Sequence, residues 1–221
     1  MSVDAEQPVS ADLDEEADRP DCRRDLAHLQ YHNPETGETA PYRCKSWDCV
    51  CCGHHMKMNL LESIDRVVEE RPELSRLLTL TVDPARFRDR KQAHREIGRA
   101  WNRLRNYVRS AYGDFSFVWV REETGDGWPH LHVLVSRFLP QSSISAAWER
   151  TGMGSVVDLR RVEARQAGHY VAKYLAKDAM ANLPSGVHRY GSSEDIDLDV
   201  RGGSSDDDSP WTLLAQDPFT G

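Results

Sequence analysis

The amino-acid sequence predicts an α+β domain with an antiparallel four-stranded sheet, preceded by a cysteine-rich segment. Two observations carry the fold. Short alternating β-branched runs are interspersed with longer segments of helical periodicity between residues 76 and 161. Four of the five cysteines fall within residues 44–52, which indicates a metal-stapled appendage. A third observation is the charge: residues 77–180 contain 17 Lys or Arg against 11 Asp or Glu, although the whole chain has a net charge of −8.

Composition divides the chain into four parts. Residues 1–21 contain eight acidic residues and one basic residue, with few large apolar groups, so we expect a disordered tail. Residues 22–72 are expected to be a zinc-binding segment and a helix, and residues 73–180 the α+β domain. Residues 181–221 are acidic and expected to be mostly disordered. With no apolar run of membrane-spanning length and no secretory signal, the expected location is cytoplasmic.

The cysteines predict a structural zinc site. Cys44, Cys49 and Cys52 have a spacing that lets three thiolates turn onto one tetrahedral ion, with Gly53 letting the chain leave the knuckle. Disulfides are disfavoured in a cytosolic chain. Cys22 is our first choice for the fourth ligand, because it would close the intervening loop onto the knuckle. The alternatives that stay open for this ligand are Cys51, His54 and His55.

The elements of the domain follow from periodicity and turn residues. Apolar positions three and four apart predict helices, and β-branched alternation bounded by Gly, Pro or Asp predicts strands. The resulting order is β-α-β-β-α-β, the ferredoxin-like pattern, in which helices cover one face of the sheet and the other face can carry a site. The predicted strands are 76–82, 115–123, 129–136 and 155–161, and the predicted helices are 57–71, 89–111, 141–150 and 164–180.

A histidine pair lies on the third predicted strand. His130 and His132 point to the same face because side chains alternate along a strand. The glycine-rich turn at residues 125–127 makes a hairpin, which brings Glu122 or Glu123, but not both, toward the pair. Two imidazoles and a carboxylate suit a divalent ion with open coordination positions. The alternative is a half-buried strand with two polar residues on its wet face.

Two further patterns suit phosphate chemistry. Tyr170, Lys173, Tyr174 and Lys177 line one stripe of the last predicted helix. Ammonium groups beside a phenol stabilise its phenolate and neutralise phosphate, although a surface stripe is the alternative. Arginines of the helix at 89–111 are a second candidate for phosphate contact. These are Arg95, Arg99, Arg103, Arg105 and Arg109.

Together these motifs resemble the HUH endonuclease family, specifically the rolling-circle replication initiators of plasmids and small viruses. The likeness covers about residues 44–180. Residues 78–81 are similar to the family's first motif, residues 129–133 to its metal-binding motif, and residues 170–177 to the motif that carries the nucleophile. A bias toward Arg and Asp suggests a haloarchaeal source.

The resemblance implies a nickase of single-stranded or extruded origin DNA. His130, His132 and Glu123, or Glu122 in its place, would hold Mn²⁺ or Mg²⁺. Tyr174, with Tyr170 as partner, would attack the scissile phosphate to give a 5′-phosphotyrosyl link and a free 3′-OH. Lys173 and Lys177 would steady the phosphate. Expected partners are DNA and host replication proteins such as a helicase and a polymerase, with no membrane and no nucleotide cofactor.

Two other classes stay open. One is an HUH transposase or relaxase, which would use the same chemistry for a different purpose. The other is a non-enzymatic zinc-dependent regulator that binds duplex DNA without cutting it. Covalent adduct formation with DNA distinguishes the enzymes from the regulator.

Overall fold

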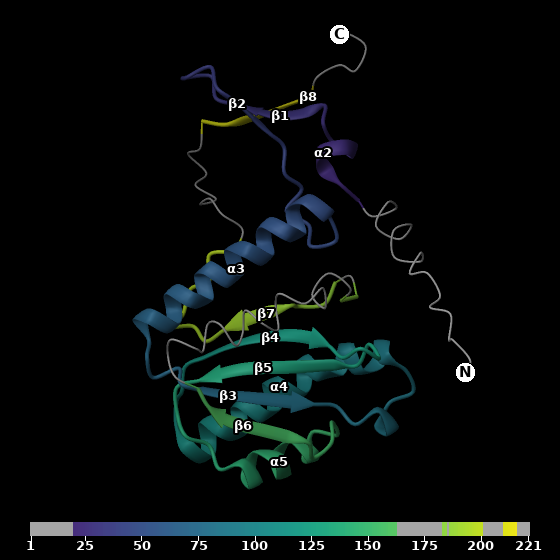
Figure 1. The fold of residues 1–221 in the computed structure, drawn as a ribbon, viewed down its shortest axis with the longest axis vertical. Helices are drawn as coiled ribbons and strands as arrows, with labels where there is room; N and C mark the ends of the chain where they lie inside the picture. The colour runs from purple at the N-terminus through teal and green to yellow at the C-terminus, as the bar shows by residue number, and fades with distance from the viewer. Residues whose placement is uncertain (1–19, 163–182, 185, 201–209, 216–221) are drawn as a thin grey trace, which may run out of the picture. The chain divides into compact units, whose positions relative to one another are not determined.

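The computed structural model describes residues 20–162, 183–184, 186–200 and 210–215, which belong to two compact units. One unit comprises the chain up to Met56 together with the residues from Gly203 onward. The other comprises Lys57–Gly202 and holds most of the regular structure (Figure 1). None of the helices in these described residues has the length and apolarity needed to cross a membrane.

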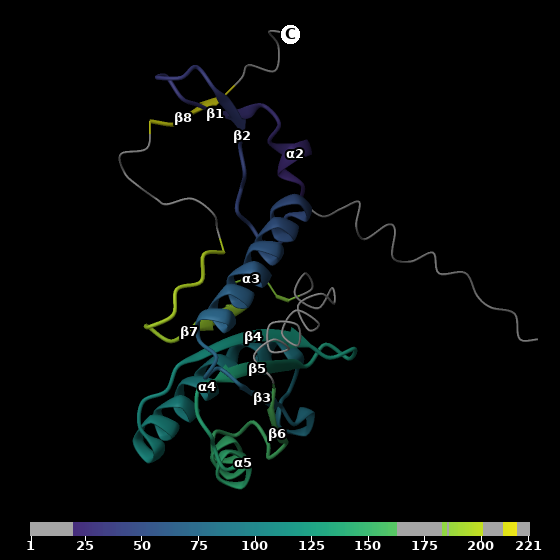
Figure 2. The same cartoon turned by 60° about the vertical axis from the view of Figure 1, so that its left-hand side comes forward.

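The smaller unit is built on a three-stranded antiparallel sheet in the order β2-β1-β8 (Figure 2). Its elements are α2 (Cys22–Asp25), β1 (Leu29–His32), β2 (Thr39–Pro41), β8 (Thr212–Ala215) and the first turns of α3 (Val50–Glu70). Strand β8 pairs with β1 along its whole length. Residues 212–215 therefore do not fit the predicted disordered tail, because they add to a strand edge that the rest of the chain already provides.

The larger unit contains the predicted β-α-β-β-α-β order. Its elements after α3 are β3 (Arg76–Thr81), η1 (Pro84–Arg86), α4 (Arg90–Tyr112), β4 (Phe117–Glu123), β5 (Pro129–Val135), α5 (Gln141–Arg150), β6 (Val157–Arg161) and β7 (Tyr190–Ser192). Asp89 caps α4 by accepting a hydrogen bond from the Gln92 amide at 2.7 Å. The predicted helix over 164–180 lies outside the described residues.

The sheet of this unit is antiparallel throughout and has the order β6-β3-β5-β4-β7. The α+β class is thus confirmed, but the sheet has five strands rather than the predicted four. The fifth strand, β7, comes from the segment predicted to be a disordered tail. It docks closely on β4, where a Cβ atom on Gly191 would lie 2.7 Å from Nε1 of Trp119.

The main core lies between the sheet and the helices α4 and α5, which cover one face (Figure 1). Leu78, Leu80, Leu131 and Val133 project to that face, and Trp148 of α5 is fully buried against them. Each such side chain contributes about 1.5–3 kcal/mol on burial. Strand alternation sends Thr79, Thr81, His130 and His132 to the opposite face.

The opposite face of the sheet is only partly free to carry a site, whereas the sequence predicted that all of it would be. Leu77, Val118, Val120 and Leu134 project from it and are buried. His132 is also buried, at 4% exposure, whereas His130 is half-buried. The polar part of this face is therefore a bounded patch at one end of strands β3, β4 and β5.

Candidate metal sites

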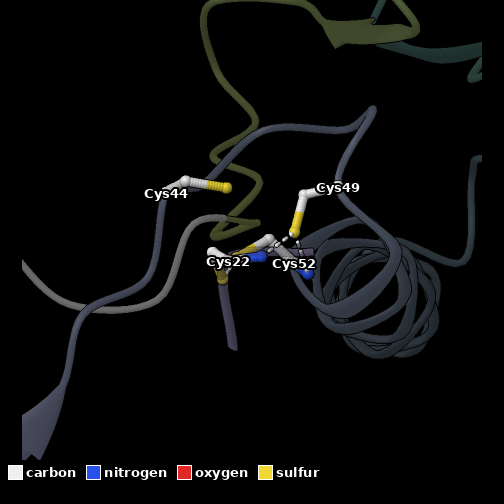
Figure 3. A group of neighbouring side chains, drawn as sticks. All are labelled: Cys22, Cys44, Cys49 and Cys52. Atoms are coloured by element: carbon white, nitrogen blue, oxygen red, sulfur yellow. Dashed lines mark hydrogen bonds between the residues drawn. The ribbon is translucent and has the colours of Figure 1, made fainter. Parts of the chain in front are cut away.

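Four cysteines gather at the N-terminal end of α3 (Figure 3). Cys22 opens α2, Cys44 follows β2, Cys49 precedes α3, and Cys52 lies in its first turn. The four sulfur atoms lie within 4.8 Å of one another, and Cys22, Cys49 and Cys52 are at most 3% exposed. All five cysteines are free thiols. A buried set of four sulfur ligands can hold a metal ion such as zinc, and its closed form is typical of a structural site.

Backbone amides prepare one of these sulfurs for the thiolate form. Burial alone would raise the pKa of Cys49, but the N–H groups of Cys52 and Cys22 donate to its Sγ at 3.5 and 3.3 Å. The balance lowers its pKa from 9.0 to about 7. Burial raises the pKa of Cys44 and Cys52, so their thiols give up protons to a metal less readily.

The structure brings Cys22 together with the three knuckle cysteines and leaves His54 and His55 outside the group. Cys51 points elsewhere, 2.6 Å from Nη1 of Arg43, and forms a second grouping with Asp21 and Cys22. Gly53 does not end the knuckle as predicted. It lies inside α3, where a Cβ atom would come within 2.5 Å of the Trp47 carbonyl oxygen.

The histidine pair lies on the sheet face away from α4 and α5. In the β4–β5 register, Glu122 is opposite His130, and Val120 is opposite His132. The Nε2 atom of His132 nevertheless reaches Oε2 of Glu122 diagonally, at 2.8 Å. The two imidazole rings are 6.3 Å apart between centroids. In the parts of the chain that the structure describes, the groupings of ligand atoms within 4.8 Å are all at the cysteines.

Glu122, rather than Glu123, is the carboxylate that the structure places with the histidines. Glu123 projects to the helix-covered face, where its Oε1 lies 2.8 Å from Nε2 of His94 on α4. The first-choice assignment of Glu123 as a metal ligand is therefore corrected to Glu122. The reason is strand alternation, since consecutive side chains cannot share a face.

The environment keeps the histidines ready to act as ligands. Burial, together with the neighbouring His132, lowers the pKa of His130, so its imidazole is neutral at neutral pH. Nδ1 of His132 lies 3.2 Å from Oγ1 of Thr79 on β3, which orients the ring with Nε2 toward Glu122. Thr79 was weighed equally as cross-strand packing and as a DNA contact. Its partner on the neighbouring strand gives it a positioning role instead.

The remaining site residues predicted from the sequence are Tyr170, Lys173, Tyr174 and Lys177. All four lie outside the described residues. The arginines of α4 divide into two groups. Arg103 donates to the Thr151 carbonyl and Arg109 pairs with Asp114, whereas Arg95, Arg99 and Arg105 line a cavity on the helix-covered side of β4.

Comparison with protein families places this α+β domain among replication proteins by similarity. Residues 75–179 match a family model described as a replication-associated protein of the ORF2 type. The matched stretch contains β3 through β6 and therefore the histidine pair. The match supports a role in the initiation of replication, and that role implies binding to DNA. The comparisons with curated proteins and with solved structures gave no match.

Proposed function

We propose that this chain is a rolling-circle replication initiator that nicks one strand of origin DNA through a covalent tyrosyl intermediate. The observation that carries the proposal is the patch formed by His130, His132 and Glu122 within the stretch that matches replication-associated proteins. Its donor set of two imidazoles and one carboxylate suits Mn²⁺ or Mg²⁺. A divalent ion held there would polarise a phosphate oxygen of the DNA.

The chain's own residues would do the rest of the chemistry. The phenol of Tyr174 loses its proton and attacks the scissile phosphorus, forming a P–O bond to the 5′ side as the P–O3′ bond breaks. The 3′ oxygen takes up a proton and is left as the primer end. Lys173 and Lys177 stabilise the phenolate and the charge on the phosphate. Tyr170 is proposed as the partner tyrosine for rejoining.

Thr79 and the strand pairing would hold the ligand geometry before DNA arrives. The hydrogen bond between Thr79 and His132 fixes the orientation of the imidazole ring, and β4–β5 pairing fixes Glu122 beside it. Zinc in the cysteine cluster would act structurally, since four protein ligands leave no position for substrate. Host helicase and polymerase would use the freed 3′-OH.

The test is covalent adduct formation. Full-length protein is incubated with origin-derived single-stranded DNA and Mn²⁺, then run on a denaturing gel beside Tyr174→Phe, Tyr170→Phe and His132→Ala. The proposal expects an adduct that Tyr174→Phe and His132→Ala abolish, and the Tyr170→Phe lane separates one nucleophile from two. Sequence-specific duplex binding with no adduct under any metal condition would instead support the non-enzymatic regulator.

A further inference from the structure

A second cavity lies on the other side of strand β4 from the histidine patch. It has a volume of about 580 Å³ and is lined by α4, β4 and residues 186–191. Trp119 and Arg121 face it because they alternate along β4 with Val120 and Glu122. Volumes of this size are typical of small-molecule sites.

Buried N–H groups without partners line this cavity. His94, Trp101 and Arg121 are each at most 3% exposed. Nδ1 of His94, Nε1 of Trp101 and Nε of Arg121 have no hydrogen-bond partner within the described residues, and neither does Nε of the half-buried Arg105. An unsatisfied buried donor costs about 1–3 kcal/mol. Several around one cavity therefore indicate acceptors that a ligand would supply.

The charge of this cavity is positive. Arg121 donates from Nη1 to the His94 carbonyl at 3.1 Å, and no carboxylate in the described residues forms an ion pair with it. Burial, with the charge of the buried Arg189 nearby, lowers the pKa of Arg121 to about 10. Arg99 is exposed at the cavity, and Glu123 is already beside His94. Buried positive charge exceeds buried negative charge here.

We propose that this cavity binds the phosphate group of a nucleotide. A guanidinium presents a planar fork of donors that matches phosphate oxygens, and the indole N–H of Trp101 adds a neutral donor. Trp119 and Tyr190 line the same cavity and supply aromatic rings on which a base can stack. The same chemistry is offered by a free mononucleotide and by one nucleotide of a DNA strand that passes the helix-covered face.

The experiment is calorimetric titration of the full chain at low ionic strength with three probes: inorganic phosphate, thymidine 5′-monophosphate and a short oligothymidylate. Arg121→Met keeps the length of the side chain and removes its charge. Arg99→Gln with Arg105→Gln changes two less buried cavity residues. Arg109→Gln is the matched control, because Arg109 is on the same helix but outside the cavity. Thermal unfolding of each variant checks folding.

We expect Arg121→Met to weaken binding of the monophosphate by about tenfold or more, since charge-assisted hydrogen bonds are lost. Arg109→Gln should bind as wild type does. If the oligonucleotide alone binds, and Arg121→Met weakens it, the ligand is a nucleotide of a strand. Binding by no probe, or equal binding by all variants, overturns the proposal. If Arg121→Met fails to fold, the Arg99→Gln/Arg105→Gln double variant decides by the same criterion.

This cavity is separate from the proposed nicking site, and its test gives a separate answer. His132→Ala should abolish the covalent adduct and leave phosphate binding at the cavity unchanged. Arg121→Met should do the reverse with phosphate as the probe. A chain without nickase activity can thus still bind nucleotide phosphate, and the converse result is equally distinguishable.

Discussion

Oε2 of Glu122 lies 2.8 Å from Nε2 of His132, although these residues are not opposite each other in the β4–β5 register. The contact is diagonal, so Glu122 is close both to His132 and to its direct partner His130. One carboxylate is thereby shared by two imidazoles. The next residue, Glu123, makes the corresponding contact with His94 on the other face.

The two adjacent glutamates give a matched pair of variants. Glu122→Gln should reduce Mn²⁺-dependent adduct formation by about 10- to 100-fold or more, because the amide is a poor ligand for a hard cation. Glu123→Gln makes the same chemical change on the opposite face and should leave the adduct yield within about twofold of wild type. Quantified denaturing gels over a Mn²⁺ titration measure both. Equal losses in the two variants would contradict the assignment of Glu122.

Thr79 offers a test of positioning. Thr79→Val is nearly isosteric and removes the hydrogen bond to Nδ1 of His132. We expect about a 10- to 100-fold loss in Mn²⁺ affinity, with folding intact, because partners of ligating histidines contribute on that scale. Thr81→Val is the control, since Thr81 lies on the same face of β3 but pairs in register with His130 rather than with His132. A manganese titration with unchanged affinity in Thr79→Val would refute the positioning role.

Prediction from sequence succeeded where a periodic pattern decided the answer. Strands β3 to β6 and helices α4 and α5 follow from alternation and helical spacing. The same alternation predicted that one glutamate at most faces the histidines. Choosing Glu122 over Glu123 required the β4–β5 register, which periodicity does not specify. Thr79 was likewise ambiguous until β3 was paired with β5.

Composition misled the assignment of the C-terminal segment. Residues 181–221 are acidic, and an average over such a stretch predicts disorder. Strands β7 and β8 are three and four residues long, and each is stabilised by pairing with an existing edge strand. Contacts between distant segments, such as Gly191 against Trp119, leave no local signal in the sequence. The cavity beside β4 escaped prediction for the same reason.

The cysteine cluster predicts a defined loss of metal. Cys49→Ser should abolish binding of about one zinc ion per chain, and Cys51→Ser should retain it, because Cys51 lies outside the four-sulfur group. Metal released by a thiol reagent, read with a zinc-sensitive dye, gives the stoichiometry. Loss of zinc in Cys51→Ser with retention in Cys49→Ser would show that the grouping of Cys51 with Asp21 and Cys22 is the real site.

Zinc affinity should also rise with pH. Cys49 has a pKa of about 7, but burial raises the pKa of Cys44 and Cys52, so these two thiols lose protons when metal binds. At pH 7.5 we expect release of about two or more protons per zinc. Calorimetry in two buffers with different ionisation enthalpies counts them. A proton release near zero would mean that the thiols are already ionised and that their burial does not control the site.

His94 should make the larger unit sensitive to acid. Burial and the charge of Arg121 lower the pKa of His94 from 6.5 to about 4, so the folded state keeps it neutral while the unfolded state takes up a proton. Its contribution is therefore fully present above pH 6.5 and is lost as the pH falls toward 4, by an amount of the order of 3 kcal/mol. Urea unfolding of wild type and His94→Asn between pH 4 and 7 should show a steeper decline for wild type. His28→Asn, at an exposed histidine, is the control. Parallel pH profiles for wild type and His94→Asn would show that His94 is protonated in the folded protein, paired with Glu123 2.8 Å away.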